Sequence, residues 1–260
     1  SIKTTIKNGV GEKLNGFAQM GMPSSVIGMI NGMMEQYLTT SEINIAESTT
    51  YKPEYSWNYE VGSHLQLFNG KLQADFAAFY MDTRNQQIAK FAETGLGRIT
   101  VNAGESESYG VEANLVASLN KNLQLNASYG YTKATFVKYD AGKEEDYSGN
   151  YVPFVPRHTM NIGGSYAFLF NNSWAQSLTL GANVTGAGKI YWTEANNASQ
   201  DFYTSLNGYI SLKTKAIQID LWGRNLTNND YTTFYFESMG RGYEQRCKPL
   251  QVGVDVRLHF

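Results

Sequence analysis

The feature that most limits the fold of this sequence is a strict two-residue alternation of apolar and polar side chains, repeated many times. The last eleven residues, LQVGVDVRLHF (250–260), show it most clearly, with Leu, Val and Phe at every even position and Gln, Asp, Arg and His at odd ones. Successive side chains of a β-strand point to opposite faces of a sheet. This segment therefore predicts a strand with one apolar and one charged face.

The same pattern recurs along most of the chain and predicts an all-β protein. No run of helical spacing is long enough to support alternating strands and helices. A tenth segment, at 1–10, alternates only weakly. The nine clear segments are 54–68, 71–87, 106–119, 122–137, 156–169, 175–190, 202–214, 216–225 and 248–260.

The connections between these segments are alternately short and long. Asn and Gly in the short ones suit the positive φ angles of tight turns. In an up-and-down barrel this order places all tight turns at one end and all long loops at the other, as in bacterial outer-membrane barrels. The short connections are 68–71, 119–122, 170–173 and 213–216, and the long ones are about 88–105, 138–155, 191–201 and 226–247.

A soluble β-sandwich also alternates apolar and polar residues, so the period alone leaves two fold classes open. Most of the segments run to ten or more residues, whereas an ordinary strand has about five or six. A strand tilted by about 45° needs roughly 9–11 residues to cross a bilayer. We therefore favour an antiparallel up-and-down transmembrane β-barrel.

Aromatic residues support this choice because they fall at the two ends of the apolar faces, where a membrane barrel has its interfaces. With the C-terminus placed in the periplasm, one group lies near the long loops and the other near the tight turns. The predicted girdle residues are Trp57, Tyr59, Tyr80, Tyr129 and Tyr131 at the outer level and Tyr166 and Phe168 at the periplasmic level.

Composition excludes several classes of function and structure. The 21 basic and 23 acidic residues form no basic stripe, so nucleic acid is not an expected partner. No stretch approaches the roughly 18 apolar residues of a membrane-spanning helix. The start, SIKTTIKNGV, has no signal peptide, which indicates either a removed leader or a chain that begins inside a longer protein. The single Cys247 excludes an internal disulfide.

Catalytic and metal motifs are scarce. No HExxH, CxxC or phosphate-binding loop is present, so neither a metal nor a cofactor is expected. His158 falls at the predicted loop rim, where Ser56 or Asp201 could complete a nucleophilic triad. A polar residue at a strand start explains His158 more simply. His64 and His259 are expected to face the lumen.

Ligand binding has stronger support in two long loops. Aromatic rings and arginines together offer stacking, cation–π contacts and anion pairing, as an anionic metal chelate or a glycan would require. Packing of one loop against another explains the same residues equally well. The candidates are Phe234, Tyr235, Phe236, Arg241, Tyr243 and Arg246 in the last loop, and Tyr191 and Trp192 in the loop before it.

Several stretches resemble the TonB-dependent receptors, particularly those of Bacteroidetes-type bacteria. In the family's order they are YKPEYSWNYEVG (51–62), GRITVNAGESESYGVEANL (97–115), VPFVPRHTMNIG (152–163), DLWGRNLTNNDY (220–231) and the terminal Phe260, which resembles the signal read by the barrel assembly machinery. The resemblance implies a 22-stranded barrel occluded by an N-terminal plug. It also implies import of a scarce nutrient, such as a siderophore, cobalamin or a glycan, with energy from TonB.

The resemblance also divides the chain. Residues 54–260 would be the C-terminal nine or ten strands of the barrel, and 1–53 an extracellular loop region. That region contains a Met-rich stretch, 16–38, which suits a short helix and either local packing or contact with a ligand or partner. Expected partners are outer-membrane lipid, the absent plug and barrel strands, the TonB complex, the assembly machinery and a surface lipoprotein.

Two other functions remain open from the residues. A complete ten-stranded outer-membrane enzyme, a protease or phospholipase, would need 1–10 as a closing strand and a cluster of His and carboxylates at one rim, but this sequence scatters them. A passive porin or adhesin fits poorly with the aromatic-rich loop at 228–248. We therefore expect a non-enzymatic receptor of the bacterial outer membrane.

Overall fold

The computed structural model describes residues 14, 23–40, 52–91, 98–102, 104–139, 146–171, 174–238 and 240–259. The chain divides into two compact units, Ser1–Tyr51 and Lys52–Phe260. In the first unit the structure has a helix, α2 (Ser24–Thr40), whose first turn is closed by bonds from the Val26 and Ile27 amides to the Pro23 carbonyl. Met29 and Met33 on this helix are exposed. The placement of 1–53 in an extracellular loop stays a prediction.

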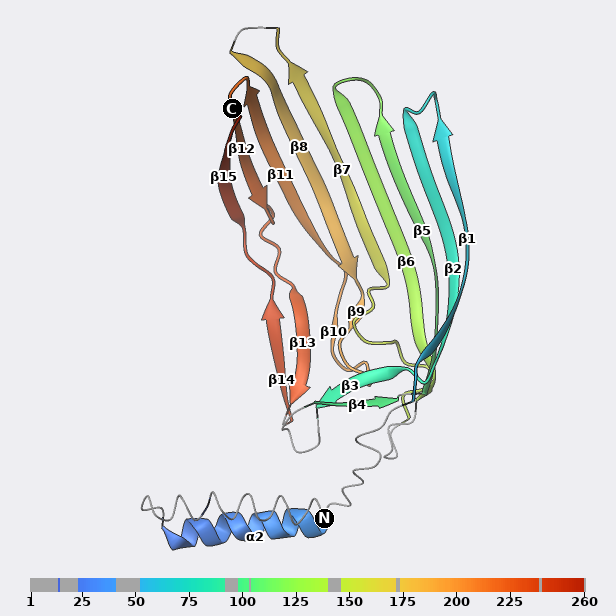
Figure 1. Ribbon diagram of the computed structural model, residues 1–260, viewed down its shortest axis with the longest axis vertical. Coiled ribbons are helices and arrows are strands. Elements are labelled where there is room, and N and C mark those ends of the chain that lie inside the picture. The colour runs from blue at the N-terminus through green and yellow to red at the C-terminus, as the bar shows by residue number, and fades with distance from the viewer. Residues whose placement is uncertain are drawn as a thin grey trace. The chain divides into compact units, whose positions relative to one another are not determined.

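The second unit is built on one nine-stranded antiparallel sheet in which each strand pairs with the next long strand of the sequence (Figure 1). All nine predicted segments form strands, so the all-β up-and-down prediction is confirmed. The strands are β1 (Tyr55–Leu67), β2 (Leu72–Arg84), β5 (Gly104–Ser118), β6 (Leu123–Tyr139), β7 (His158–Leu169), β8 (Ala175–Gly188), β11 (Tyr203–Thr214), β12 (Ile217–Arg224) and β15 (Gln251–Leu258).

The tight turns lie together at one end of the sheet and the long connections at the other, as the sequence predicts (Figure 1). The β1–β2 turn has positive φ at Asn69 and Gly70, the two residues expected to adopt it. Phe68 also has a positive φ, of 55°, which the pattern does not predict. The turn is closed by the Lys71 amide donating to the Phe68 carbonyl.

The long connections are more ordered than the sequence indicates. Three of the four contain two-stranded hairpins instead of irregular loops. These are β3 (Gln87–Phe91) with β4 (Arg98–Asn102), β9 (Ile190–Tyr191) with β10 (Ser199–Gln200), and β13 (Thr232–Ser238) with β14 (Arg241–Arg246). In TTFYFES (232–238) aromatic rings occur on both faces of the strand, so the polarity alternation that marks the other strands is absent.

Cross-strand register keeps the two faces of the sheet in phase. One continuous row is apolar, and the neighbouring row on the opposite face is polar; a one-residue slip of any strand would exchange them. The apolar row is Leu65, Ala74, Leu115, Ala127, Ile162, Val184 and Leu206, and the polar row is His64, Asp75, Asn114, Ser128, Asn161, Thr185 and Ser205.

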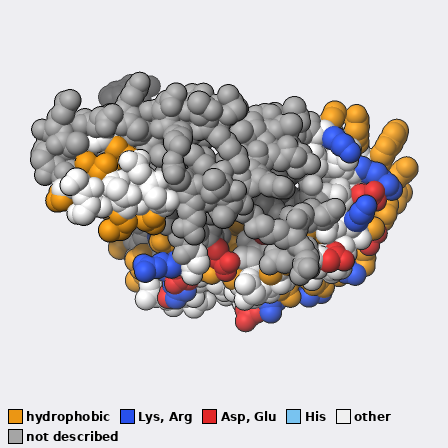
Figure 2. All heavy atoms as spheres, turned by 90° about the horizontal axis from the view of Figure 1, so that it is seen from below, with side chains coloured by type: hydrophobic (Ala, Val, Ile, Leu, Met, Phe, Trp, Pro, Cys, Tyr) orange, Lys and Arg blue, Asp and Glu red, His pale blue; other side chains and the backbone are white. Residues whose placement is uncertain are grey.

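No second sheet covers the apolar face within the described part of the chain. Val61 and Val252 on that face are 73% and 70% exposed. A sandwich would bury these residues, whereas lipid can cover them in a membrane barrel. Seen from the loop end, hydrophobic side chains protrude along the outer edge, beside charged ones (Figure 2). None of the described helices is long and apolar enough to span a membrane.

The polar face carries aromatic rings as well as polar side chains. Three glycines of this face lie under a ring of the neighbouring strand. Phe79 covers Gly110, Tyr209 covers Gly181 and Trp222 covers Gly253, so that a Cβ at each glycine would lie 2.2 to 2.8 Å from the ring. A ring laid over a cross-strand glycine pins the register of the pair.

Candidate functional site

Two long connections are joined into one body at the loop end of the sheet. The Phe154 amide donates to the Tyr191 carbonyl at 2.8 Å, and the Arg157 amide donates to the Lys189 carbonyl at 3.1 Å. The Asn196 side chain accepts from the Tyr151 amide and donates to the Tyr151 carbonyl. We call residues 146–157 and 189–201 together the loop platform.

The loop platform rests on the outer end of β6. Phe136 is fully buried there, packs edge-on against Tyr139 at 4.8 Å and is joined by Tyr147 and Val152. The turn into this cluster is closed by Asp146, whose carboxylate accepts bonds from the hydroxyl and the amide of Ser148. The Ser148 hydroxyl, followed by its amide, lowers the pKa of Asp146 below its ordinary value. The platform is therefore anchored rather than loosely attached.

A ladder of rings connects the loop platform to the β13–β14 hairpin. Phe154 meets Trp192 edge-on at 5.6 Å and stacks on Phe234 at 5.7 Å. Phe236 continues the ladder, 5.9 Å from Phe234, and stacks on Tyr243 at 5.1 Å. Trp192 is only 7% exposed and anchors the ladder, whereas Phe154 is half exposed.

Phe154 is the residue of this ladder that sequence reasoning missed. Its φ of 65° lies in the left-handed region, which costs a bulky residue about 1–3 kcal/mol. The Phe154–Tyr191 backbone bond and the two flanking rings hold it there. A proline-rich stretch, VPFVP (152–156), was the only local sign of an unusual backbone.

A second stack lies on the same platform. The Tyr151 and Tyr191 rings are parallel within 9° at 5.1 Å. The Arg157 guanidinium lies 4.9 Å from the Tyr151 ring centre and the Lys189 ammonium 5.5 Å from the Tyr191 ring centre. The pair of rings is therefore flanked by two cations, a surface that suits a planar or anionic ligand.

The β13–β14 hairpin separates its side chains by register. Phe236 lies opposite Tyr243, so both point to the face that carries the ring ladder. Tyr235 lies opposite Glu244 on the other face and donates to Glu237 at 3.0 Å, a bond that raises the pKa of Tyr235. The predicted aromatic candidates of this loop thus do not form one surface.

The two predicted arginines also differ. Arg246 pairs with Asp230 at 2.5 Å and lies 3.6 Å from Glu244, and the Asp230 bond raises the pKa of Arg246. It closes the base of the hairpin. Arg241 is exposed at the hairpin tip, opposite Ser238. Arg246 and Trp192 therefore fit the packing explanation, while Arg241, Phe234 and Tyr243 stay candidates for ligand contact.

Asn225 holds the last long connection at its origin. Its side chain is 5% exposed, donates to the carbonyls of Asn229 and Lys248, and accepts from the Asn229 amide. Nearby, the rings of Tyr203 and Tyr231 stack at 3.8 Å. The NLTNN motif (225–229) therefore has a structural role, because it clamps the two ends of the 226–247 connection.

The predicted girdle residues all lie on the apolar face by register, although their contact with the membrane interface stays a prediction. At the outer level Tyr59, Tyr80 and Tyr109 form one row, in which Tyr109 was not foreseen. Near the tight turns Tyr166 and Phe168 pack edge-on at 4.7 Å. Phe260 falls outside the described residues.

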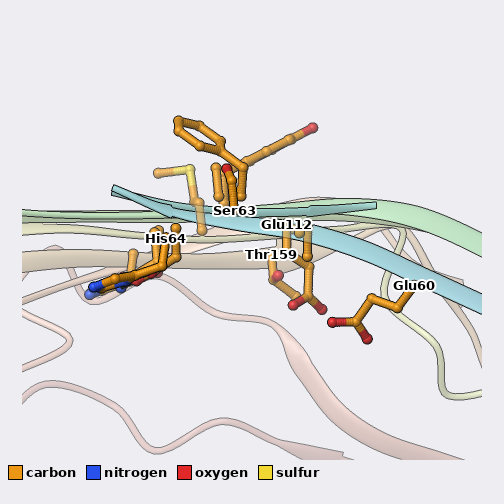
Figure 3. A pocket seen from close by; sticks show the side chains of 16 residues that line it. Glu60, Ser63, His64, Glu112 and Thr159 are labelled. Atoms are coloured by element: carbon orange, nitrogen blue, oxygen red, sulfur yellow. Dashed lines mark hydrogen bonds and ion pairs between the residues drawn. The ribbon is translucent and has the colours of Figure 1, made fainter. Parts of the chain in front are cut away.

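The three residues considered for a catalytic triad each contact a different partner and not one another. His158 Nδ1 lies 2.8 Å from the Tyr129 hydroxyl, Ser56 bonds to Thr83, and Asp201 pairs with Lys189. His64 contacts Asp75 on the polar face, beside Glu60, Glu112 and Thr159, while Ser63 points to the opposite face (Figure 3). In the described ranges no group of three or more His, Cys, Asp or Glu residues could hold a metal ion.

Comparison with known proteins agrees with this architecture. Residues 15–226 match a family model described as TonB dependent receptor-like, beta-barrel. The chain is 27% identical over 208 residues to the ferric-pyoverdine M114 receptor PbuA of a Pseudomonas species, covering 76% of this chain and 24% of the relative. It is 29% identical over 139 residues to the metal-pseudopaline receptor CntO of Pseudomonas aeruginosa, covering 54% of this chain and 18% of the relative.

Solved structures share the fold. The ferric yersiniabactin uptake receptor FyuA from Yersinia pestis matches with a TM-score of 0.67 and 21% identity, over 80% of this chain and 30% of that one. The siderophore receptor PiuA from Acinetobacter baumannii matches with a TM-score of 0.64 and 22% identity, over 81% of this chain and 29% of that one.

The chain thus spans between about a fifth and a third of the proteins it matches. The matched proteins are outer-membrane receptors and transporters, not enzymes, and the predicted location is confirmed. A Bacteroidetes-type origin stays a prediction. Strand order, exposed apolar face and family match agree, and the chain belongs to the TonB-dependent receptor family as a part of the outer-membrane β-barrel.

Proposed function

We propose that the protein containing this chain captures a metal–siderophore chelate with its extracellular loops and imports it with energy from TonB. The observation that carries this proposal is the ring ladder from Trp192 and Phe154 to Tyr243, beside the cation-flanked Tyr151–Tyr191 stack. Rings offer stacking and apolar contact to the organic part of a chelate, and cations offer pairing with its negative charge, so one rigid platform that carries both suits an anionic metal chelate. The names of the relatives PbuA and CntO support a metal chelate over cobalamin or a glycan.

In this proposal the sheet is a scaffold and performs no chemistry. Its polar face carries hydroxyls and amides in a row from His64 to Ser205, a surface suited to a plug domain or to a passing ligand. The plug, the TonB complex, the assembly machinery and a surface lipoprotein on the loops are proposed partners. The ten-stranded enzyme has no support, because His158, Ser56 and Asp201 each have other partners.

The test uses the complete protein in cells starved of iron. Uptake of a panel of radiolabelled ferric siderophores is measured for the native protein and for Phe154→Ala and Tyr243→Ala. Loss of one stacked ring is expected to weaken binding of the transported siderophore by about tenfold, on the order of 1.4 kcal/mol.

Trp174→Ala is the matched control, because Trp174 is an exposed aromatic at the tight-turn end of the sheet. Its uptake is expected to equal that of the native protein. If no ferric siderophore is transported, while cobalamin or an oligosaccharide is, the metal-chelate assignment fails. If a siderophore is transported equally well by both loop variants, the ring ladder is not its binding surface.

A further inference from the structure

A compact polar cluster interrupts the apolar face of the sheet on β5, β6 and β7. Lys133 lies opposite Tyr109, and His158 lies opposite Tyr131, so all four side chains share the face that also carries the exposed valines. Tyr129 is on the same face, next to His158. We call these five residues the Lys133–His158 cluster.

The members of the cluster contact one another through their rings and polar atoms. The Lys133 ammonium is 5.5 Å from the centre of the Tyr109 ring. The His158 ring is 5.2 Å from the Tyr131 ring, and its Nδ1 atom is 2.8 Å from the Tyr129 hydroxyl. When Tyr129 donates to Nδ1, the ring proton is on Nε2, which becomes a donor directed away from that bond. The Lys133 ammonium is a second donor.

The height of the cluster follows from the rows of the sheet. Mainly apolar rows run along β1 from Leu67 to Val61, and the Val61 row also holds Tyr131 and His158. The next row outward contains Tyr59, Tyr80, Tyr109 and Lys133. One row further out the same face carries Asp82 and Glu107. The cluster therefore lies where the apolar band ends on the loop side. In a membrane barrel this is the level of the lipid headgroups.

The carboxylates near Lys133 are bonded to other side chains. Arg84 binds Asp82 and Glu105, each at 3.1 Å. Glu107 accepts from the Tyr80 hydroxyl at 3.5 Å. Within the described ranges no carboxylate comes within ion-pair distance of Lys133. Lys133 contacts the Tyr109 ring but has no described carboxylate to balance its charge. A cation in this position is stabilised by the anions of the headgroup layer.

We propose that the Lys133–His158 cluster binds a phosphate group of an outer-leaflet lipid. The ammonium of Lys133 and the Nε2 atom of His158 donate to the phosphate oxygens, while the Tyr109 and Tyr131 rings contact the glycerol or sugar part of the headgroup. Tyr129 is a positioning residue that selects the donor form of His158. This site is independent of the ligand that the loops capture.

The test measures lipid retention on the complete receptor purified in detergent. Native mass spectrometry follows titration with bis-phosphorylated lipid A, with the same lipid after phosphate removal, and with inorganic phosphate as competitor. Lys133→Gln is expected to weaken retention of the phosphorylated lipid by about fivefold, the effect of one cation near a membrane surface. The pair Lys133→Gln and His158→Gln is expected to weaken it further, and Lys133→Arg to restore it.

Lys213→Gln is the matched control, because Lys213 pairs with Gln218 on the polar face. It should leave lipid retention unchanged. Siderophore uptake by each variant checks that it has folded. Equal retention of phosphorylated and dephosphorylated lipid, or full retention by the Lys133 and His158 double variant, would overturn the proposal. Displacement of the lipid by inorganic phosphate at equal concentration would assign the cluster to free phosphate and overturn the lipid site.

Discussion

At the scale of single residues, side chains at the loop end are held in place at a measurable conformational cost. Phe154 keeps a left-handed backbone because a backbone bond and two rings surround it. Asn225 also has a positive φ, of 48°, but Asn tolerates this region and its side chain bonds to both ends of the last connection. Phe154 is strained to present a ring, whereas Asn225 adopts the same backbone region at little cost and closes a loop.

Asn225→Ala should therefore release the 226–247 connection while the sheet stays folded. The change removes two donated bonds and one accepted bond of a buried amide. Groups left unsatisfied cost about 1–3 kcal/mol. Hydrogen exchange of the amides at 228–248 should accelerate by about tenfold or more for about 1.4 kcal/mol of lost protection.

Asn197→Ala, at an exposed position of the loop platform, is the control for this change. Its exchange at 228–248 should match that of the native protein. Unchanged protection in Asn225→Ala would mean that the ring ladder and the Arg246–Asp230 pair hold the connection without Asn225.

At the scale of elements, the register of the sheet depends on pairs of a ring and a glycine as well as on alternation. Gly181 on β8 lies directly opposite Tyr209 on β11, and a Cβ at Gly181 would lie 2.2 Å from the Tyr209 ring. The same arrangement joins Trp222 on β12 to Gly253 on β15. These pairs occur on the polar face, where apolar burial does not specify the register.

Gly181→Ala is expected to destabilise the barrel by about 1–3 kcal/mol, because the Tyr209 ring has to move. In a Tyr209→Ala background the same substitution should cost much less, since the ring is gone. A double-mutant cycle of urea unfolding in detergent measures the difference. Additive effects of the two substitutions would show that the ring does not rest on Gly181.

At the scale of the whole molecule, the nine strands form an open sheet in which β1 and β15 each pair with one described neighbour. Unpaired strand edges are not tolerated in lipid, because every backbone polar group needs a partner there. Further strands of the same protein, as in the much longer relatives, would supply those partners.

This predicts the intact mass of the natural protein extracted from outer membranes. We expect a mass roughly two to three times that of this chain, in line with a 22-stranded barrel and its plug. Mass spectrometry with N-terminal sequencing would place the additional residues before Ser1. A mass equal to that of the 260 residues would contradict the fragment expectation and return attention to a small closed barrel.

The elements of this protein that depend on local periodicity could be predicted from the order of its amino acids. Nine segments alternate with period two, and each forms a strand. The alternation places apolar side chains on one face and polar side chains on the other, so that one face can contact lipid and the other water. The order of short and long connections correctly predicted that the tight turns lie at one end of the sheet and the long connections at the other. The resemblance of ordered motifs indicated the family, which the family match confirms.

Which residues of the long connections contact one another could not be predicted, because it depends on the three-dimensional arrangement of the loops. Phe154 meets Phe234 although the two are far apart in the sequence, and Arg246 pairs with Asp230 rather than staying free for a ligand. Such contacts leave no period in the sequence, because they depend on how separate loops are brought together by the sheet. The β13–β14 hairpin could not be predicted for a related reason. Aromatic residues lie on both of its faces, so it lacks the apolar–polar alternation of the nine strands of the main sheet.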